Sequence, residues 1–81
     1  MKIQIKIRLK NGILDPQGKT VNNALHHLGF TTIENVRIGK LVELEMDEQN
    51  REQAGKKIDE ACRKLLANPV IEDYDFEITE D

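Results

Sequence analysis

Residues 14–19, with the sequence LDPQGK, contain the residue types that are typical of a helix N-terminus. They follow a segment in which apolar and polar residues strictly alternate. Asp15 can accept a hydrogen bond from the free N–H groups of the first helical turn, and its charge suits the positive end of the helix dipole. Pro16 fits the first helical position, where a missing N–H costs nothing. Because strand side chains alternate between two faces, the preceding pattern predicts a half-buried strand before this helix. Its apolar residues are Ile3, Ile5, Ile7 and Leu9.

Two helices are predicted from apolar spacing and end signals. The first covers residues 16–28, and Gly29 is expected to stop it in a left-handed conformation. The second begins after Asn50, which resembles a capping box together with Gln53, and it ends before Pro69. Five residues are expected to form the apolar face of this second helix: Ala54, Ile58, Ala61, Cys62 and Leu65.

A hairpin is predicted between the two helices. Val36 and Ile38 give the apolar parity of a second strand, and a third strand follows with Val42, Leu44 and Met46. A three-residue loop over residues 39–41 keeps all five apolar residues on one side, because it pairs Ile38 with Val42. The same register sets Arg37 beside Glu43 on the outer face.

The last strand is predicted around Tyr74, Phe76 and Ile78, and the three residues after it are expected to fray. The element order is then βαββαβ, the split βαβ pattern of ferredoxin-like folds. We therefore expect an α+β two-layer sandwich with an antiparallel sheet and, because crossovers are right-handed, both helices on one face. A chain of 81 residues suits a single domain over residues 1–81. A domain this small buries only about 60% of its unfolded surface, so oligomerisation or docking on a partner is expected.

The net charge of −3 conceals a strong asymmetry. Residues 1–40 carry seven Lys or Arg and two acids, whereas residues 41–81 carry five and thirteen. In the predicted topology the first and last strands are antiparallel neighbours, so cations of one would face acids of the other. The residues concerned are Lys6, Arg8 and Lys10 opposite Asp73, Asp75 and Glu77. This pairing accounts for the asymmetry without a nucleic-acid partner, and the outer parity of the first strand lacks the aromatic residues of an RNA reader.

The sequence also indicates a compartment. Cys62 is the only cysteine, which excludes an internal disulfide and favours a reducing environment. The N-terminus lacks the apolar run of a signal peptide, and no segment is long enough to cross a bilayer. We therefore expect a cytoplasmic protein that does not bind a membrane.

No residue cluster has the pattern of an active site. His26 and His27 are adjacent on a helix and point about 100° apart, so they cannot chelate one metal ion together, although either could border an interface. Cys62 lies on an apolar helix face, which is typical of a buried small hydrophobe. Alternating outward carboxylates on the last strand do not converge on a cation. We predict no catalytic, cofactor-binding or metal-binding residue on this chain.

The predicted hairpin tip is the one surface with a distinctive pattern. Arg37, Gly39 and Lys40 combine a glycine with flanking cations, which can dock on a partner or hold an anion. A solvated hairpin tip is the alternative. We take Arg37, Gly39 and Lys40 as candidate partner contacts.

Four segments in sequence order resemble the PurS family, the small subunits of phosphoribosylformylglycinamidine synthase: residues 14–19 (LDPQGK), 24–30 (ALHHLGF), 36–40 (VRIGK) and 62–74 (CRKLLANPVIEDY). The resemblance covers essentially the whole chain and is least diagnostic over residues 50–57. It implies a subunit of a glutamine-dependent ligase of purine (IMP) biosynthesis, which amidinates formylglycinamide ribonucleotide. It also implies two partners, a large synthetase subunit (PurL type) that uses ATP and Mg, and a glutaminase subunit (PurQ type) that releases ammonia. The PurS-like subunit itself is implied to form a homodimer or tetramer and to have no catalytic residue or cofactor.

Three hypotheses for the function follow from these sequence features. The first is an adaptor that joins glutaminase and synthetase and assists ammonia transfer. The second is a freestanding small-molecule or anion sensor of ferredoxin-like fold, in which Arg37 and Lys40 hold an anion. The third is an independent enzyme that uses His26 or Cys62. The four segments and the lack of catalytic groups favour the adaptor.

Overall fold

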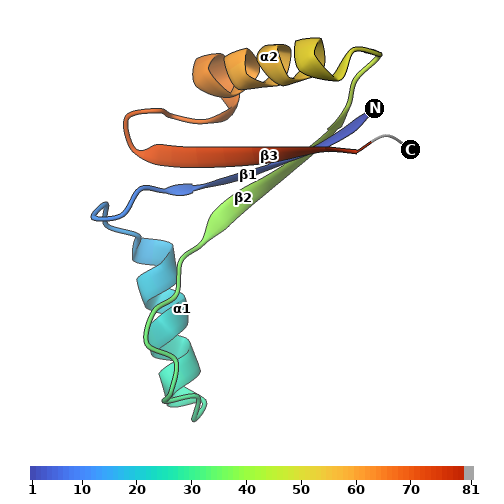
Figure 1. The fold of residues 1–81 in the computed structure, drawn as a ribbon. Coiled ribbons are helices and arrows are strands. Elements are labelled where there is room, and N and C mark those ends of the chain that lie inside the picture. The colour runs from blue at the N-terminus through green and yellow to red at the C-terminus, as the bar shows by residue number, and fades with distance from the viewer. Residues whose placement is uncertain (80–81) are drawn as a thin grey trace.

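The computed structural model describes residues 1–79 of the chain. Its elements in order are β1 (Lys2–Leu9), α1 (Pro16–His27), β2 (Gly39–Glu45), α2 (Arg51–Ala61), a π-helical turn η1 (Cys62–Leu66) and β3 (Glu72–Thr79). The strands form one antiparallel sheet in the order β2-β1-β3 (Figure 1). The α+β class and the antiparallel pairing of the first and last strands are therefore confirmed. Thr79 belongs to β3 and is not frayed, and residues 80 and 81 lie outside the described part.

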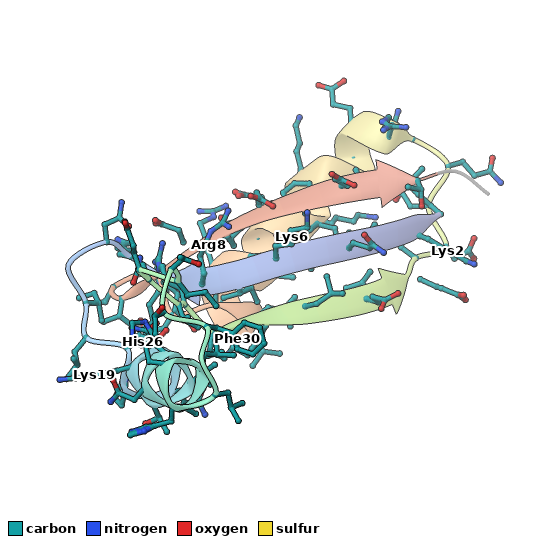
Figure 2. The ribbon with its side chains drawn as sticks, turned by 90° about the horizontal axis from the view of Figure 1, so that it is seen from below. Lys2, Lys6, Arg8, Lys19, His26 and Phe30 are labelled. Atoms are coloured by element: carbon teal, nitrogen blue, oxygen red, sulfur yellow. The ribbon has the colours of Figure 1, made fainter. Side chains whose placement is uncertain are left out.

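The hydrophobic core lies between the sheet and α2. The side chains of Ile3, Ile5 and Ile7 on β1 are at most 2% exposed, as the alternation of the sequence predicts. Four residues on or just after α2 and η1 complete the buried set: Ala54, Ile58, Cys62 and Ala67. Figure 1 shows α2 lying along one face of the sheet. The opposite face, which we call the open face, carries Lys2, Lys6 and Arg8 of β1 (Figure 2).

The π-helical turn η1 changes which leucine faces the core. Leu65 was expected on the apolar face of the second helix, but it is 83% exposed. Leu66 packs against the core in its place. A π-helical turn contains more residues than an α-helical turn, so the positions at its end are rotated about the helix axis relative to a regular α-helix. The prediction for Leu65 is wrong for this reason.

The predicted hairpin of residues 36–46 is also wrong. Gly39 is the first residue of β2 and pairs with Arg8, and Val42 pairs with Ile5 instead of Ile38. A Cβ atom on Gly39 would lie 2.6 Å from the carbonyl oxygen of Ile7, so the glycine permits close strand contact and does not form a turn. The order β2-β1-β3 remains consistent with a ferredoxin-like βαββαβ arrangement, with the expected strand at Val36 and Ile38 missing from the edge of the described sheet.

Residues 10–38 form an arm that leaves the end of the sheet. In Figure 1, α1 projects away from the sheet on the side opposite α2, so the prediction that both helices cover one face is wrong. One physical reason is width: three strands about 4.8 Å apart are largely covered by a single helix about 10 Å across. Gly18 is the only buried residue of the arm. The radius of gyration is 16.1 Å, whereas a compact domain of this length has about 12 Å.

Candidate functional site

The root of the arm is held by Asp15. Its Oδ1 atom accepts a hydrogen bond from the Gly18 N–H at 3.0 Å, which confirms the predicted helix cap. Its Oδ2 atom accepts from the Ile38 N–H at 2.9 Å, on the segment that returns to the sheet. These two hydrogen bonds, that of Gly18 first, lower the pKa of Asp15. One carboxylate therefore joins the beginning of α1 to the end of the arm.

Gly18 allows the two sides of the arm to approach closely. A Cβ atom at this position would lie 2.3 Å from the carbonyl oxygen of Val36 and 2.7 Å from Oδ2 of Asp15. Real side chains do not tolerate such distances. Position 18 therefore requires a glycine, because the return segment crosses α1 at this point. The sequence does not reveal this requirement, because Val36 is distant in the chain.

The tip of the arm is closed by backbone hydrogen bonds and one histidine. Gly29 has φ of 100°, and the Phe30 N–H donates to the Leu25 carbonyl at 2.9 Å, which completes the predicted left-handed stop. Nε2 of His26 lies 2.6 Å from the carbonyl oxygen of Ile33, to which it donates a hydrogen bond. His26 therefore holds the turn after α1 together. Leu28 and Phe30 remain 74% and 55% exposed at this tip.

The structure places the three candidate partner contacts at the arm root and not on a hairpin. Nη1 of Arg37 donates to Oδ1 of Asn11 at 3.2 Å, and Nζ of Lys40 lies 3.7 Å from Oε2 of Glu72. Gly39 lies between them within β2. The three residues line one hollow of about 380 Å³, together with Lys6 and Arg8 of the open face. They thus border one hollow, although the hairpin that suggested them does not exist. Lys40 lies opposite Ile7 in the register, so its position belongs to the core side of the sheet, whereas Gly39 lies opposite Arg8.

On the open face, Lys6 and Arg8 of β1 lie opposite Asp75 and Asp73 of β3, as predicted, and within residues 1–79 Arg8 alone of the predicted cations forms an ion pair with β3. Nη2 of Arg8 lies 3.1 Å from Oδ2 of Asp75, across the β1–β3 pairing. Both side chains are more than half exposed, so the pair contributes little free energy. The acids of β3 therefore lie beside a basic strand, although Lys6 forms no ion pair with them.

Cys62 does not have the environment of a nucleophile. Its side chain is fully buried, and burial, followed by the nearby carboxylate of Asp59, raises the pKa of the thiol. A reactive cysteine needs the opposite, an accessible thiol with a lowered pKa. The prediction of a buried small hydrophobe is confirmed. Within residues 1–79 the structure contains no group of three or more His, Cys, Asp or Glu that could hold a metal ion.

A second hollow at the arm root was not predicted. It measures about 480 Å³ and lies between the end of β1, the beginning of α1 and residues 35–37. We call it the arm-root pocket. Its polar lining consists of Lys10, Asn11, Asp15, Lys19, Asn22, Asn35 and Arg37. Because these residues come from three separate segments, no local motif could have revealed the pocket.

Comparison with known proteins gives consistent results. The family described as PurS, phosphoribosylformylglycinamidine (FGAM) synthase, matches residues 2–80. The FGAM synthase subunit PurS of Bacillus subtilis is 43% identical over 79 residues, which span 98% of this chain and 93% of that protein. The crystal structure of PurS from Methanocaldococcus jannaschii, one of the subunits of formylglycinamide ribonucleotide amidotransferase in the purine biosynthetic pathway, is 40% identical with a TM-score of 0.88, over 99% of this chain and 96% of that one. A chain in the structure of PurLQS from Thermotoga maritima is 32% identical with a TM-score of 0.86, over 94% of this chain and 93% of that one.

Proposed function

The chain belongs to the PurS family of FGAM synthase, and on this premise we propose that it is a non-catalytic adaptor that joins the glutaminase and synthetase subunits of that enzyme. It is a subunit of a ligase complex of purine biosynthesis. The observation that carries the adaptor role is the arm, which exposes apolar side chains on a chain that buries its one thiol. The similarity to a chain of PurLQS supports PurL-type and PurQ-type partners.

The exposed area of the chain supports assembly. Its accessible surface is 6138 Å², whereas a compact monomer of 9.3 kDa has about 5,000 Å². The difference of about 1,100 Å² is comparable to the roughly 800 Å² that one partner buries in a standard interface. The chain therefore exposes an excess area comparable to what one protein partner would cover.

We propose that the first partner is a second copy, which gives a homodimer or tetramer. β2 and β3 are the outer strands of the sheet, so each leaves one edge unpaired in the described chain. Open strand edges pair readily with another strand. Light scattering at micromolar concentration should give at least twice the mass of the chain, and a monomeric mass would contradict this proposal.

We propose that Arg37, Gly39 and Lys40 contribute to the contact with the synthetase or glutaminase. Reversal of both charges, Arg37→Glu with Lys40→Glu, should weaken co-purification with the partner subunits and leave the circular dichroism spectrum unchanged. The matched control is Lys56→Glu with Lys64→Glu, which changes the net charge equally on α2 and η1. Equal loss in both variants would show a general charge effect and not a contact.

The proposed mechanism of the adaptor is to hold its partners in an arrangement that excludes water. Ammonia released by the PurQ-type subunit must reach the PurL-type subunit, which we propose uses ATP and Mg, before it escapes to solvent. A closed, preorganised assembly limits such losses. Residues 1–81 would act in it as one domain.

We propose that the chain works in the cytoplasm, because a single buried thiol suits a reducing compartment. In residues 1–79, neither the length nor the composition of any helix meets the requirement for crossing a bilayer.

Reconstitution tests the adaptor role. Synthetase and glutaminase are mixed with and without this chain, and turnover is measured once with glutamine and once with ammonium chloride. We expect the chain to raise the glutamine-dependent rate and to leave the ammonium-dependent rate unchanged. Equal glutamine-dependent turnover in both mixtures would refute the proposal.

Neither alternative function gains support. The relatives described above are named as subunits of the synthase, and none is named as a sensor. An independent enzyme would need His26 or Cys62, but the first bonds to the Ile33 carbonyl and the second is buried. Unchanged activity of the complex after His26→Ala and Cys62→Ser would confirm that neither is a reagent.

A further inference from the structure

The cations that have no ion pair gather at the root of the arm. Six of the twelve Lys and Arg side chains lie within ion-pair distance of a carboxylate in the described residues, such as Lys57 with Glu48 at 2.7 Å. In the described part of the chain, Lys6, Lys10, Lys19 and Arg37 have no such pair. Three of these four line the arm-root pocket, and Lys6 lines the adjacent hollow that shares Arg37. Positive charge is therefore concentrated here, and Asp15 is the one acidic residue in the lining of the arm-root pocket.

Asn22, which lines the same pocket, has a side-chain oxygen that lacks a partner and that does not reach the pocket surface. Oδ1 of Asn22 is buried and accepts no hydrogen bond, and among the described residues it is the only buried side-chain oxygen or nitrogen in this state. Asn22 lines the arm-root pocket from α1. Buried polar groups in native proteins are nearly always hydrogen-bonded, so this atom indicates a missing donor.

The arm-root pocket keeps a net positive charge even though Asp15 is part of its lining. Its carboxylate is the only acidic group in the lining, against Lys10, Lys19 and Arg37. Both of its oxygens already accept backbone N–H groups, of Gly18 and Ile38. With Asp15 ionised and the three cations charged, the lining carries a net charge of about +2. A phosphate monoester carries about −1.5 to −2 at pH 7, which matches this charge.

We propose that the arm-root pocket binds a small sugar phosphate. Lys10, Lys19 and Arg37 hold the phosphate by charge-assisted hydrogen bonds. The Asn22 side chain rotates toward the pocket, where its Oδ1 accepts a hydrogen bond from a ligand hydroxyl. The pocket volume of about 480 Å³ is within the usual range for a small-molecule site. Its cations come from the end of β1, from α1 and from the return segment, so the bound ligand fixes the direction in which the arm leaves the sheet.

Amide chemical shifts of the full chain, recorded during titration, test the proposal. The probe is ribose 5-phosphate, with inorganic phosphate as the second arm. We expect saturable shifts at Lys19, Asn22 and Arg37 with a Kd on the order of 1 mM or tighter for ribose 5-phosphate, and weaker binding of inorganic phosphate. No saturation by 20 mM, a concentration about twentyfold higher, would overturn the proposal. Equal affinity for both probes would overturn the role of Asn22.

Matched variants separate the pocket from general electrostatics. Lys10→Ala with Lys19→Ala should weaken ribose 5-phosphate binding about tenfold or more. Lys56→Ala with Lys64→Ala removes the same charge from residues paired with Glu52 and Glu60 and should leave the Kd unchanged. Asn22→Ala should weaken the binding of ribose 5-phosphate and leave that of inorganic phosphate unchanged. Asn23→Ala, at the neighbouring exposed position, should change the Kd of neither probe. Equal weakening by both lysine pairs would overturn the proposal.

The site goes beyond the adaptor function and can fail separately. If the titration fails while the chain still raises glutamine-dependent turnover, the adaptor role stands and the ligand site does not. If the chain binds ribose 5-phosphate but has no effect on turnover, the ligand site stands and the adaptor role does not.

Discussion

The sheet with α2 and the arm are stabilised in different ways. The sheet region contains every buried apolar residue of the described chain, with Ile5 and Cys62 fully buried. The arm has nearly thirty residues and buries Gly18 alone. Its shape comes from hydrogen bonds at its two ends, through Asp15 at the root and His26 at the tip. The sheet region therefore has its own hydrophobic core, although it also exposes Leu41, Leu65 and Val70. The arm depends on local hydrogen bonds and on what covers it.

This difference assigns separate tasks to the two regions. A region with its own hydrophobic core can fold before any partner arrives. A segment with Leu14, Leu28 and Phe30 more than half exposed gains most when another surface covers it. We therefore interpret the sheet region as the scaffold and the arm as the part that is stabilised when a partner covers it.

Truncation of one apolar residue in each region gives the largest expected difference in stability between the sheet region and the arm. Ile5→Ala should lower the free energy of unfolding by about 2–5 kcal/mol, because it leaves a cavity in a closed core. Leu28→Ala, which truncates a side chain that is 74% exposed, should change the stability of the dilute chain by less than about 0.5 kcal/mol. Urea denaturation at low and high protein concentration measures both. A loss for Leu28→Ala at low concentration as large as that for Ile5→Ala would contradict the division.

Two glycine substitutions compare the arm with α2. Gly18→Ala should cost about 1–3 kcal/mol, because its methyl group would collide with the Val36 carbonyl. Gly55→Ala, in α2 with open space around it, should stabilise by about 0.5–1 kcal/mol. Hydrogen exchange should show the loss in Gly18→Ala within residues 10–38 and not at β1. Faster exchange at β1 would mean that the arm and the sheet unfold together.

Acid should loosen the arm root through Asp15. Because the folded-state pKa of Asp15 is lowered, its contribution is complete above the ordinary aspartate value of about 3.9 and is lost as the pH falls through the lower folded value. Exchange of the Ile38 amide should therefore accelerate below that pH, beyond the intrinsic trend. Asp15→Asn should remove this pH dependence, since the amide carries no titrating proton. An Ile38 profile that is identical in the two proteins would refute the role of Asp15.

The smallest effect is expected on the open face. Arg8→Ala removes the pair with Asp75, whose side chains are 52% and 58% exposed. Solvent screens such a pair, so the free energy of unfolding should fall by less than about 1 kcal/mol and by still less in high salt. A loss approaching that of Ile5→Ala would show that the charged face is part of the stabilising structure. Thermal unfolding at two salt concentrations gives the answer.

Local chemistry made part of the fold predictable. The alternation of Ile3, Ile5 and Ile7 identified the central strand, and the Asp15–Pro16 junction and Gly29 set the limits of α1 to within one residue. The charge pattern predicted that β1 and β3 are neighbours, as Arg8 and Asp75 confirm. Each of these signals acts within a few residues or through simple alternation.

The errors arose where distant segments decide the outcome. Gly39 resembles a turn residue in sequence, but contact with Ile7 places it inside a strand. Leu65 fits a regular helix, and only the π-helical turn reveals that Leu66 faces the core. The arm-root pocket combines Lys10, Lys19 and Arg37 from three segments, so no spacing rule could bring them together. Arg37, Gly39 and Lys40 remain predicted contacts, and they border one hollow at the arm root.

Hydrogen–deuterium exchange of this chain, alone at high dilution and within the complex with its synthetase and glutaminase, tests the scaffold-and-arm division most directly. The division predicts that amides of residues 10–38 exchange faster than those of β1 in the dilute chain and become protected on assembly, while β1 hardly changes. Arm amides that are already as slow as those of β1 in the dilute chain, and that do not respond to the partners, would contradict it.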